Sequence, residues 1–279
     1  MISVIICSRE KSIPNNLLKN IEQTIGMAYE LITVDNSDTK YSIFEAYNIG
    51  LIKSQHSIVC FIHDDIHFIT QNWGQVVIEV FNKDLNIGLI GIAGSKSKTK
   101  MPSPWWESPD EDLFIHINQY LRDGKKEYWS KGFQNTSLED VVTIDGVFMA
   151  ARKDTSILFN TNLKGFHNYD LNFSFEYLRK GYRVVVTKDI LLEHLSIGVL
   201  NEGWYKSTLK IHDVYQNFLP LNKSNFISSK NYEFKNGTKF ITELLKLKLK
   251  GPAFYLWIKL LWIKPLSKFH VKFLKSLFQ

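Results

Sequence analysis

The chain has 279 residues, of which 44% are hydrophobic and 14% aromatic, so a disordered chain, a disulfide mini-scaffold and a bare interaction peptide are excluded. Its two cysteines, Cys7 and Cys60, lie inside apolar runs and indicate neither a disulfide framework nor a zinc site. The net charge is +6, but residues 239–279 contain nine lysines and one acid and carry +8, which leaves a nearly neutral body of −2 and argues against a nucleic-acid partner.

The first half of the chain alternates short apolar runs with amphipathic segments. Strands are predicted over residues 2–8, 30–35, 57–65 and 88–94, and helices from near Pro14, over 41–54 and over 73–81. The apolar runs lack strict alternation, which is typical of strands covered on both faces. The pattern predicts an α/β fold with a mainly parallel, Rossmann-like sheet flanked by helices, whose ligands bind beyond the carboxyl ends of the strands.

Residues 95–140 are polar and rich in aromatic side chains, and we interpret them as a long loop or excursion, of a length that is usually functional or mobile. Within it, Trp105 and Trp106 either stack on the apolar faces of sugar rings or anchor the loop in the core. Strand character resumes over 141–152, a helix is predicted over 167–182, and further strand over 183–196.

Acidic residues stand where several predicted strands end. Asp35 follows LITV, Asp64 and Asp65 follow IVCFIH, and Asp145 follows VVTI. Each alone is compatible with a turn or a helix cap. Together they would concentrate negative charge at one edge of the sheet, which a bound cation or a ribose hydroxyl would explain. Oxygen ligands without clustered thiolates suit Mg²⁺ or Mn²⁺.

Five segments bring these features into a recognisable order: MISVIICSR, ELITVDNS, EAYNIGLIKSQHSIVCFIHDDI, IDGVFMAARKD and FHNYDLNFSFEYLRKGYRVVVTKDILLEHLS. In order and approximate spacing they resemble the family 2 glycosyltransferases with a GT-A fold, and most of all bacterial members that extend surface polysaccharides. The resemblance covers about residues 1–200. It implies a nucleotide diphosphate-sugar donor and a divalent metal ion.

The resemblance also implies which residues bind the donor. Ser8 and Arg9 end the first strand beside the nucleotide, and Asp35 matches the acid that hydrogen-bonds the base. Asn48, with Gly50, falls in the motif before the metal-binding strand.

The segment HDDI occupies the place of the family's DXD motif. His63 stands where the first acid is usual, so Asp65 is the expected metal ligand, with Asp64 and His63 as ribose or phosphate contacts. His194 matches a histidine that some members use on the metal or diphosphate, and a packed core histidine is the alternative. Glu193 would point to the opposite face of that strand.

Asp170 matches the acid at the start of the acceptor-side helix that acts as general base in the family. Its alternative is an acid favoured at a helix N-terminus by the macrodipole. Asp145 either lines the same cleft as a donor contact or forms a turn.

The C-terminal segment is a separate unit in this interpretation. We expect a GT-A domain over 1–203, with 95–140 as its acceptor-side excursion, and a helical, basic, amphipathic extension over 204–279. Between Leu266 and Phe278 apolar residues follow helical spacing with lysines on the other side, which predicts an amphipathic helix. Residues 239–279 would bind the inner face of a membrane, or else the helix packs on the body with solvated lysines.

The sequence therefore favours an inverting glycosyltransferase that transfers sugar to a glycan or lipid-linked acceptor. A catalytically idle GT-A domain that binds nucleotide sugar or glycan in a membrane assembly remains the alternative, because HDDI departs from the family motif. A nucleotidyltransferase is a weaker option, since the first strand leads into SREKS without a glycine. With no secretory signal at the N-terminus, we expect a cytoplasmic, peripherally membrane-bound protein.

Overall fold

The central element of the fold is a mixed β-sheet, seen in a computed structural model that describes residues 1–223 and 230–277. Its strands are β1 (Ile2–Ser8), β2 (Tyr29–Asp35), β3 (Ile58–Ile62), β5 (Ile87–Gly91), β10 (Leu138–Val141), β12 (Phe148–Arg152) and β13 (Arg183–Thr187). They pair in the order β10-β13-β5-β12-β3-β1-β2. β1, β2, β3, β5 and β13 run in one direction, while β12 and β10 run in the other. The predicted α/β sheet is confirmed, with two antiparallel members that the sequence did not reveal.

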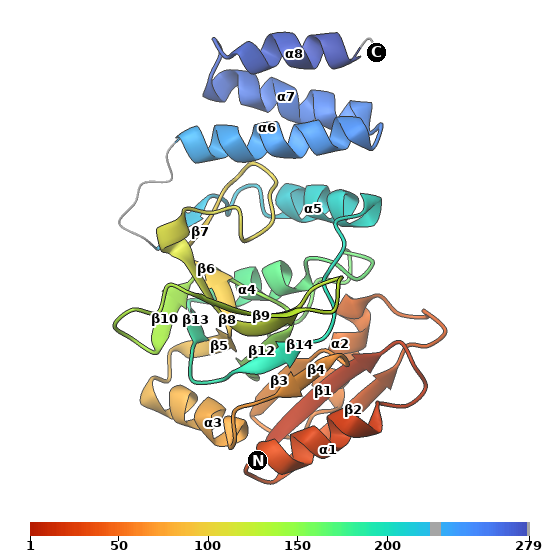
Figure 1. Cartoon of the computed structure of the whole chain (residues 1–279), viewed down its shortest axis with the longest axis vertical. Helices are drawn as coiled ribbons and strands as arrows, with labels where there is room; N and C mark the ends of the chain where they lie inside the picture. The colour runs from red at the N-terminus through yellow and green to blue at the C-terminus, as the bar shows by residue number, and fades with distance from the viewer. Residues whose placement is uncertain (224–229, 278–279) are drawn as a thin grey trace.

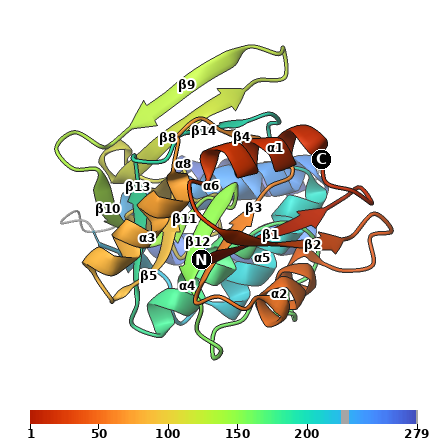
Figure 2. The same ribbon diagram turned by 90° about the horizontal axis from the view of Figure 1, so that it is seen from below.

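Helices cover both faces of this sheet (Figure 2). They are α1 (Asn15–Thr24), α2 (Ile43–Lys53), α3 (Trp73–Lys83) and α4 (Tyr169–Arg179). The helix α5 (Glu202–Val214) packs on the outer side of α4, where Tyr215, just after its end, contacts Asn172 and Phe175. The strand β3 shows why both faces must be covered: Val59 and Phe61 join the core under α2 and α4, and Cys60 joins the core under α1 and α3. The close packing of α2 on β1 requires Gly50, because a Cβ there would lie 2.4 Å from the side chain of Ile5.

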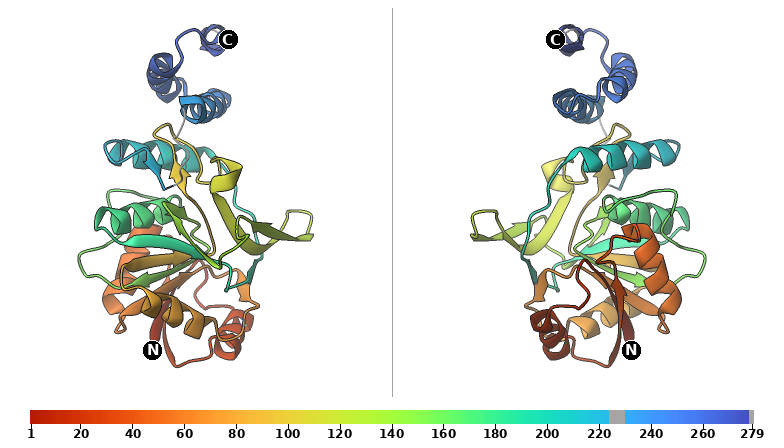
Figure 3. Two further views of the ribbon diagram at one scale, coloured as in Figure 1. Left: turned by 90° about the vertical axis from the view of Figure 1, so that its left-hand side faces the viewer. Right: turned by 90° about the vertical axis from the view of Figure 1, so that its right-hand side faces the viewer.

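A second sheet crosses the first near the carboxyl ends of its strands. It consists of β4 (Ile66–Phe68), β6 (Ala93–Ser95), β8 (Leu113–Tyr120), β9 (Lys126–Lys131), β11 (Thr143–Ile144) and β14 (Leu192–His194). The segment 95–140 is thus not the continuous loop expected from its sequence. Within it β8 and β9 form a hairpin that projects from the body (Figure 3). A short 3₁₀ turn, η1 (Asp110–Asp112), precedes β8, and β7 (Ser97–Lys98) pairs with β15 (Leu221–Asn222).

The C-terminal helices stack at the end of the molecule farthest from the N-terminus (Figure 1). They are α6 (Lys230–Lys246), α7 (Lys250–Ile263) and α8 (Lys268–Leu277). Their apolar core also takes in Met101, Trp204 and Tyr205. Because Trp204 and Tyr205 lie in α5, which reaches the main core through Ile211, the expected boundary at residue 203 falls inside a helix that belongs to both units.

The amphipathic helix expected between Leu266 and Phe278 is present as α8, although Phe278 lies outside the described residues. Its apolar side is partly covered: Phe273 is buried and its ring stacks on Trp257 at a centroid distance of 5.0 Å, whereas Leu274 is 41% exposed. Packing on the neighbouring helices therefore accounts for Phe273 and not for the whole face. Over residues 1–223 and 230–277, none of the helices has both the length and the apolar character needed to cross a bilayer.

Candidate active site

A pocket of about 630 Å³ opens where the two sheets meet, and most of its lining is apolar. Its walls come from the end of β3, the strand β8, the turn between β11 and β12, the start of α4 and the segment after β14. The lining includes both predicted acceptor contacts and four of the predicted acidic or histidine positions. These side chains are His63, Trp105, Trp106, Asp145, Asp170 and His194, together with Trp129 and Trp204.

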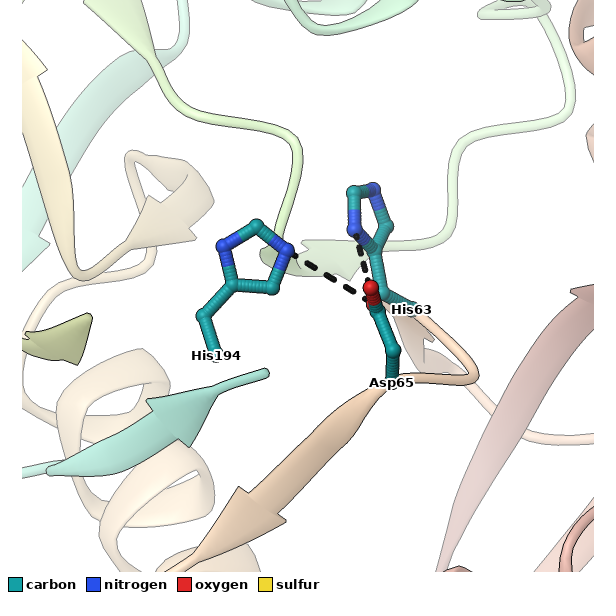
Figure 4. Close-up of side chains that lie close together, drawn as sticks. All are labelled: His63, Asp65 and His194. Carbon is teal, nitrogen blue, oxygen red and sulfur yellow. Dashed lines mark ion pairs between the residues drawn. The ribbon is translucent and has the colours of Figure 1, made fainter. Parts of the chain in front are cut away.

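His63, Asp65 and His194 form a compact group at the edge of this pocket (Figure 4). Asp65 Oδ1 lies 3.6 Å from His63 Nδ1 and 3.6 Å from His194 Nε2. Atoms that share one ion at about 2.1 Å are separated by about 3.0 to 4.2 Å, so this spacing fits three ligands of one cation. His63 therefore joins the candidate metal group as well as the donor side to which its sequence position assigned it.

The surroundings of His194 support a cation at this place. Its Nδ1 lies 3.0 Å from Gln119 Oε1, an amide oxygen that only accepts, so Nδ1 carries the proton. The Gln119 amide is fixed in this sense because its nitrogen donates to three backbone oxygens, those of residues 120, 194 and 196. In the neutral form of His194, Nε2 then turns a lone pair toward the carboxylate of Asp65, and the two atoms can share a cation; in the protonated form, Nε2 donates to that carboxylate instead.

Two further hydroxyl groups orient this cluster. Tyr169 places its hydroxyl 2.5 Å from His63 Nε2, which leaves Nδ1 directed at Asp65. Ser196 donates to Asp65 Oδ2 at 2.5 Å. The position of Tyr169 depends on Gly146, since a Cβ at that residue would lie 2.3 Å from the tyrosine oxygen. Partners of this kind are typical of metal sites, where they fix the orientation of the ligands.

The electrostatics of the cluster favour charged forms. Burial opposes ionisation of Asp65, yet hydrogen bonds from His194, His63 and Ser196 hold its pKa well below its usual range. Burial also lowers the pKa of His63, but the carboxylate of Asp65 and other nearby acids outweigh it and leave that pKa above its ordinary value. The site is therefore an anionic carboxylate held between two imidazoles.

Asp170, which also lines the pocket, stands in the first turn of α4. Burial raises the pKa of its carboxyl group to about 7, and the negative charge of Asp145 contributes in the same direction. A carboxylate that titrates near neutral pH is suited to accept a proton from a hydroxyl. This location is compatible with both interpretations of Asp170, as a general base and as an acid favoured at a helix N-terminus.

Asp145 sits in the turn between β11 and β12 and lines the pocket. Its Oδ2 accepts a hydrogen bond of 3.0 Å from the indole nitrogen of Trp105, and its Oδ1 accepts one from the backbone of Val147. Trp105 is only 7% exposed, so it anchors its loop and holds Asp145. Trp106, 40% exposed, keeps an open ring face and is the better placed of the two tryptophans for a sugar contact.

The predicted nucleotide end lies beside β1. The carboxylate of Asp64 accepts from the hydroxyl of Ser8 and from the backbone N–H of Arg9, both at 3.4 Å, and its other oxygen is 3.8 Å from the Arg9 guanidinium. Asp35, exposed at the end of β2, accepts from the backbone of Ser37, which lowers the pKa of its carboxyl group. These four residues thus gather at the ends of adjoining strands.

Asn48 lies in a different environment from the one expected of a donor contact. Both ends of the Asn48 amide bind the backbone of Phe159, with distances of 2.8 and 2.9 Å, so this side chain fixes the 155–165 segment to α2, and its donor contact stays a prediction. Glu193 points away from His194, as expected from strand alternation, and pairs with Lys126 of the hairpin at 2.9 Å.

The sequence did not identify Tyr169, Gln119 or Trp129 as site residues. Tyr169 directly precedes Asp170 and reads as an ordinary core aromatic, while Gln119 and Trp129 lie in the segment interpreted as a loop. The apolar residues of LFIHINQY, with alternation over Ile115 to Asn118, were the signal that could have placed Gln119 on a strand.

The predicted donor edge, the metal-type cluster and the Asp170 carboxylate stand on the GT-A fold of glycosyltransferases. The structure is similar to "GalNAc-T7 with UDP, GalNAc and Mn2+", with a TM-score of 0.50 and 12% identity over 76% of this chain. That match spans 47% of the GalNAc-T7 chain, less than half of its length. It is also similar to "S. aureus TarS 1-349 in complex with UDP-GlcNAc", with a TM-score of 0.50 and 14% identity over 93% of this chain and 79% of that one.

Family membership rests on sequence. The sequence model described as "Glycosyltransferase like family" matches residues 3–217, so the chain belongs to that family. A search of curated proteins gave no match. The matched range includes α5 and ends before the C-terminal helices.

Proposed function

We propose that this protein is an inverting glycosyltransferase that moves a sugar from a nucleoside diphosphate-sugar to a hydroxyl group of a glycan or lipid-linked glycan, in the synthesis of a bacterial surface polysaccharide. The observation that carries the proposal is the placement of Asp170 in the same pocket as the group formed by His63, Asp65 and His194. The His63, Asp65 and His194 group is suited to a leaving diphosphate, and the carboxylate of Asp170 to an attacking hydroxyl.

His63, Asp65 and His194 would hold Mn²⁺ or Mg²⁺, and their two imidazoles favour Mn²⁺. When bound, such an ion stabilises the negative charge that develops on the leaving diphosphate. Both similar structures were determined with UDP or a UDP-sugar, and that of GalNAc-T7 with Mn²⁺, which supports this assignment.

Asp170 would accept the proton of the acceptor hydroxyl as its oxygen forms a bond to the anomeric carbon. The bond from that carbon to the diphosphate oxygen breaks in the same step, and attack from the opposite face inverts the configuration. A positioned base of this kind contributes about 10²- to 10⁴-fold in rate. Asp145 lies close enough for its charge to keep Asp170 basic.

The acceptor would lie along the apolar wall of the pocket. Trp106 and Trp129 line that wall from two different segments, the loop before η1 and the hairpin strand β9. Indole rings stack on the C–H faces of sugars, so a glycan acceptor fits this lining better than a small polar molecule.

The proposal is tested with Asp170→Asn and with metal removal. We expect the variant to keep donor binding, measured as a rise in melting temperature with nucleoside diphosphates and Mn²⁺, while sugar transfer falls by about 10²- to 10⁴-fold. Chelation should weaken donor binding in both proteins. Transfer at the wild-type rate by Asp170→Asn would refute the base assignment.

The idle-domain alternative makes a separate expectation. It is supported if nucleotide sugars bind across a broad panel but neither transfer nor hydrolysis occurs with any acceptor. Its sequence basis was the histidine in HDDI, and the structure shows that this His63 faces Asp65 within the candidate metal group.

We also propose that the protein works in the cytoplasm, peripherally at the inner face of the cell membrane. The charge of +8 on residues 239–279 supports this location, because anionic lipids of that leaflet attract lysine-rich segments.

A further inference from the structure

The helix α7 has two apolar faces of which only one is packed. Ala253, Leu256 and Leu260 are buried against the other C-terminal helices, with exposures of 0–2%. On the opposite side, Phe254, Ile258 and Trp262 are exposed by 44%, 41% and 86%. Their spacing of four residues places them in one row along the helix.

Two further large apolar side chains are exposed near this row. Tyr255, next to Phe254 in α7, is 52% exposed, and Leu266, in the turn between α7 and α8, is 98% exposed. The outward face of α7 is defined here as Phe254, Tyr255, Ile258, Trp262 and Leu266. A helix that is apolar on all sides is normally buried in a core or in a membrane, so this face indicates a partner.

The charge around the face limits what that partner can be. Residues 250–277 contain six lysines and no acidic residue. Lys259 lies over the ring of Tyr255, with its nitrogen 4.3 Å from the ring centroid, so positive charge borders the apolar row directly. A second copy of the chain would bring like charges together, whereas an anionic surface would be attracted.

The dimensions and residue types fit a lipid surface. With 14 residues, α7 is about 21 Å long, shorter than the roughly 30 Å of a hydrocarbon core, so it can lie in the interface but cannot span it. Tryptophan and tyrosine are enriched at membrane interfaces, where an apolar ring and a polar atom meet different surroundings.

We propose that the outward face of α7 inserts into the headgroup layer of a membrane containing anionic phospholipids, with the surrounding lysines on the lipid phosphates. This assigns membrane contact to α7 and the turn after it; α8 buries Phe273 but exposes Val271 and Leu274 by 58% and 41%, outside the face defined above. The proposal refines the membrane location given above. It is independent of catalysis, because vesicle binding is measured without donor or acceptor.

The test is co-sedimentation of the full chain with phosphatidylcholine vesicles and with vesicles that also contain phosphatidylglycerol. The wild type should bind the mixed vesicles and not the neutral ones, and added salt should weaken binding. The double variant Ile258→Asn/Trp262→Ser should bind at least about tenfold more weakly, because two inserting side chains are lost. Both positions are exposed, and an unchanged melting temperature shows that the variant folds.

Two controls make the result specific. Ile52→Asn alters a residue that is 74% exposed on α2, and it should bind like the wild type. Lys264→Gln/Lys268→Gln should bind the mixed vesicles more weakly than the wild type, and neither protein should bind the neutral vesicles. Failure of the wild type to bind them, or equal weakening by Ile52→Asn, overturns the proposal. So does a dimer in sedimentation velocity that the α7 double variant abolishes, since a second copy would then cover the face.

Discussion

Asp170 and Asp145 form a pair of carboxyl groups with different roles. Asp145 is held by an indole N–H and a backbone N–H, and its negative charge faces a pocket in which Asp170 titrates near neutral pH. The pKa of about 7 means that Asp170 becomes a competent base only as the pH rises through that value.

Replacement of Asp145 should move this titration. In Asp145→Asn the negative charge that favours the protonated form of Asp170 is removed, so its pKa should fall and the rising limb of kcat/KM should shift to lower pH. The measurement is the pH dependence of kcat/KM for both proteins. Asp123→Asn, on the exposed β8–β9 turn, is the control and should leave the limb in place. If the rising limb of kcat/KM does not shift in Asp145→Asn, then the charge of Asp145 does not set the pKa of the catalytic base.

Several residues of the site could be predicted from the sequence because their type and position carry chemistry. Asp65 and His194 are 129 positions apart, yet both were expected near one metal, and they meet at 3.6 Å. Tyr169 and Gln119 could not be assigned in this way. Each acts through a partner that is distant in sequence, and only the folded chain brings His63 and His194 to them. Trp105 was expected at the site, but its hydrogen bond to Asp145 could not be predicted from the sequence.

At the scale of elements, α6 holds the loop that forms one wall of the pocket. The carboxylate of Glu233 accepts hydrogen bonds of 2.7 Å from the backbone of Lys100 and from that of Met101. Asn236 donates to Thr99 and to the backbone of Glu107. The same loop carries Trp105 and Trp106, which line the pocket, so the orientation of α6 and the shape of this wall depend on one another.

Loss of the Glu233 contacts should loosen this wall. We expect Glu233→Ala to raise the KM for the acceptor while donor binding stays unchanged, and to lower the free energy of unfolding by about 1–3 kcal/mol, since two hydrogen bonds to a charged group disappear. Steady-state kinetics and denaturant titration measure the two effects. Glu243→Ala, on the same helix and paired with Lys246, serves as the matched control. Equal changes in both variants would contradict a specific role for the loop.

The elements themselves were largely predictable where hydrophobic runs were long. Strands β1, β2 and β3 and helices α1 to α4 lie within a few residues of their expected ranges. The hairpin of β8 and β9 was not expected, because its outer strand KEYWSK is mostly exposed and offers no apolar run. Its pairing depends on contact with β8, which local sequence does not reveal.

On the scale of the whole molecule, the C-terminal helices are part of the folded body and not a tail. Their core includes Trp204, Tyr205 and Met101, which belong to the segments around the pocket. The basic segment of residues 239–279 therefore does not form a structural unit separate from the nearly neutral rest of the chain.

Deletion of residues 223–279 should consequently destabilise the remainder. It would expose Trp204 and Tyr205, each now 7% exposed, at about 1.5–3 kcal/mol for a large apolar side chain. We expect a lower melting temperature and aggregation, measured by thermal denaturation with light scattering. A truncated chain that melts at the wild-type temperature would show that the body is autonomous.

The loop of residues 99–107 is fastened on one side to α6 and on the other, through Trp105, to Asp145. If the protein binds a bilayer and an acceptor as proposed, such an attachment would link the two binding events. Binding free energies are reciprocal. If a bilayer changes the affinity of the protein for its acceptor by a certain factor, the acceptor changes the affinity of the protein for the bilayer by the same factor. An enzyme with this linkage would remain longest on membranes that display its acceptor, and would leave most readily from those where the acceptor has been consumed.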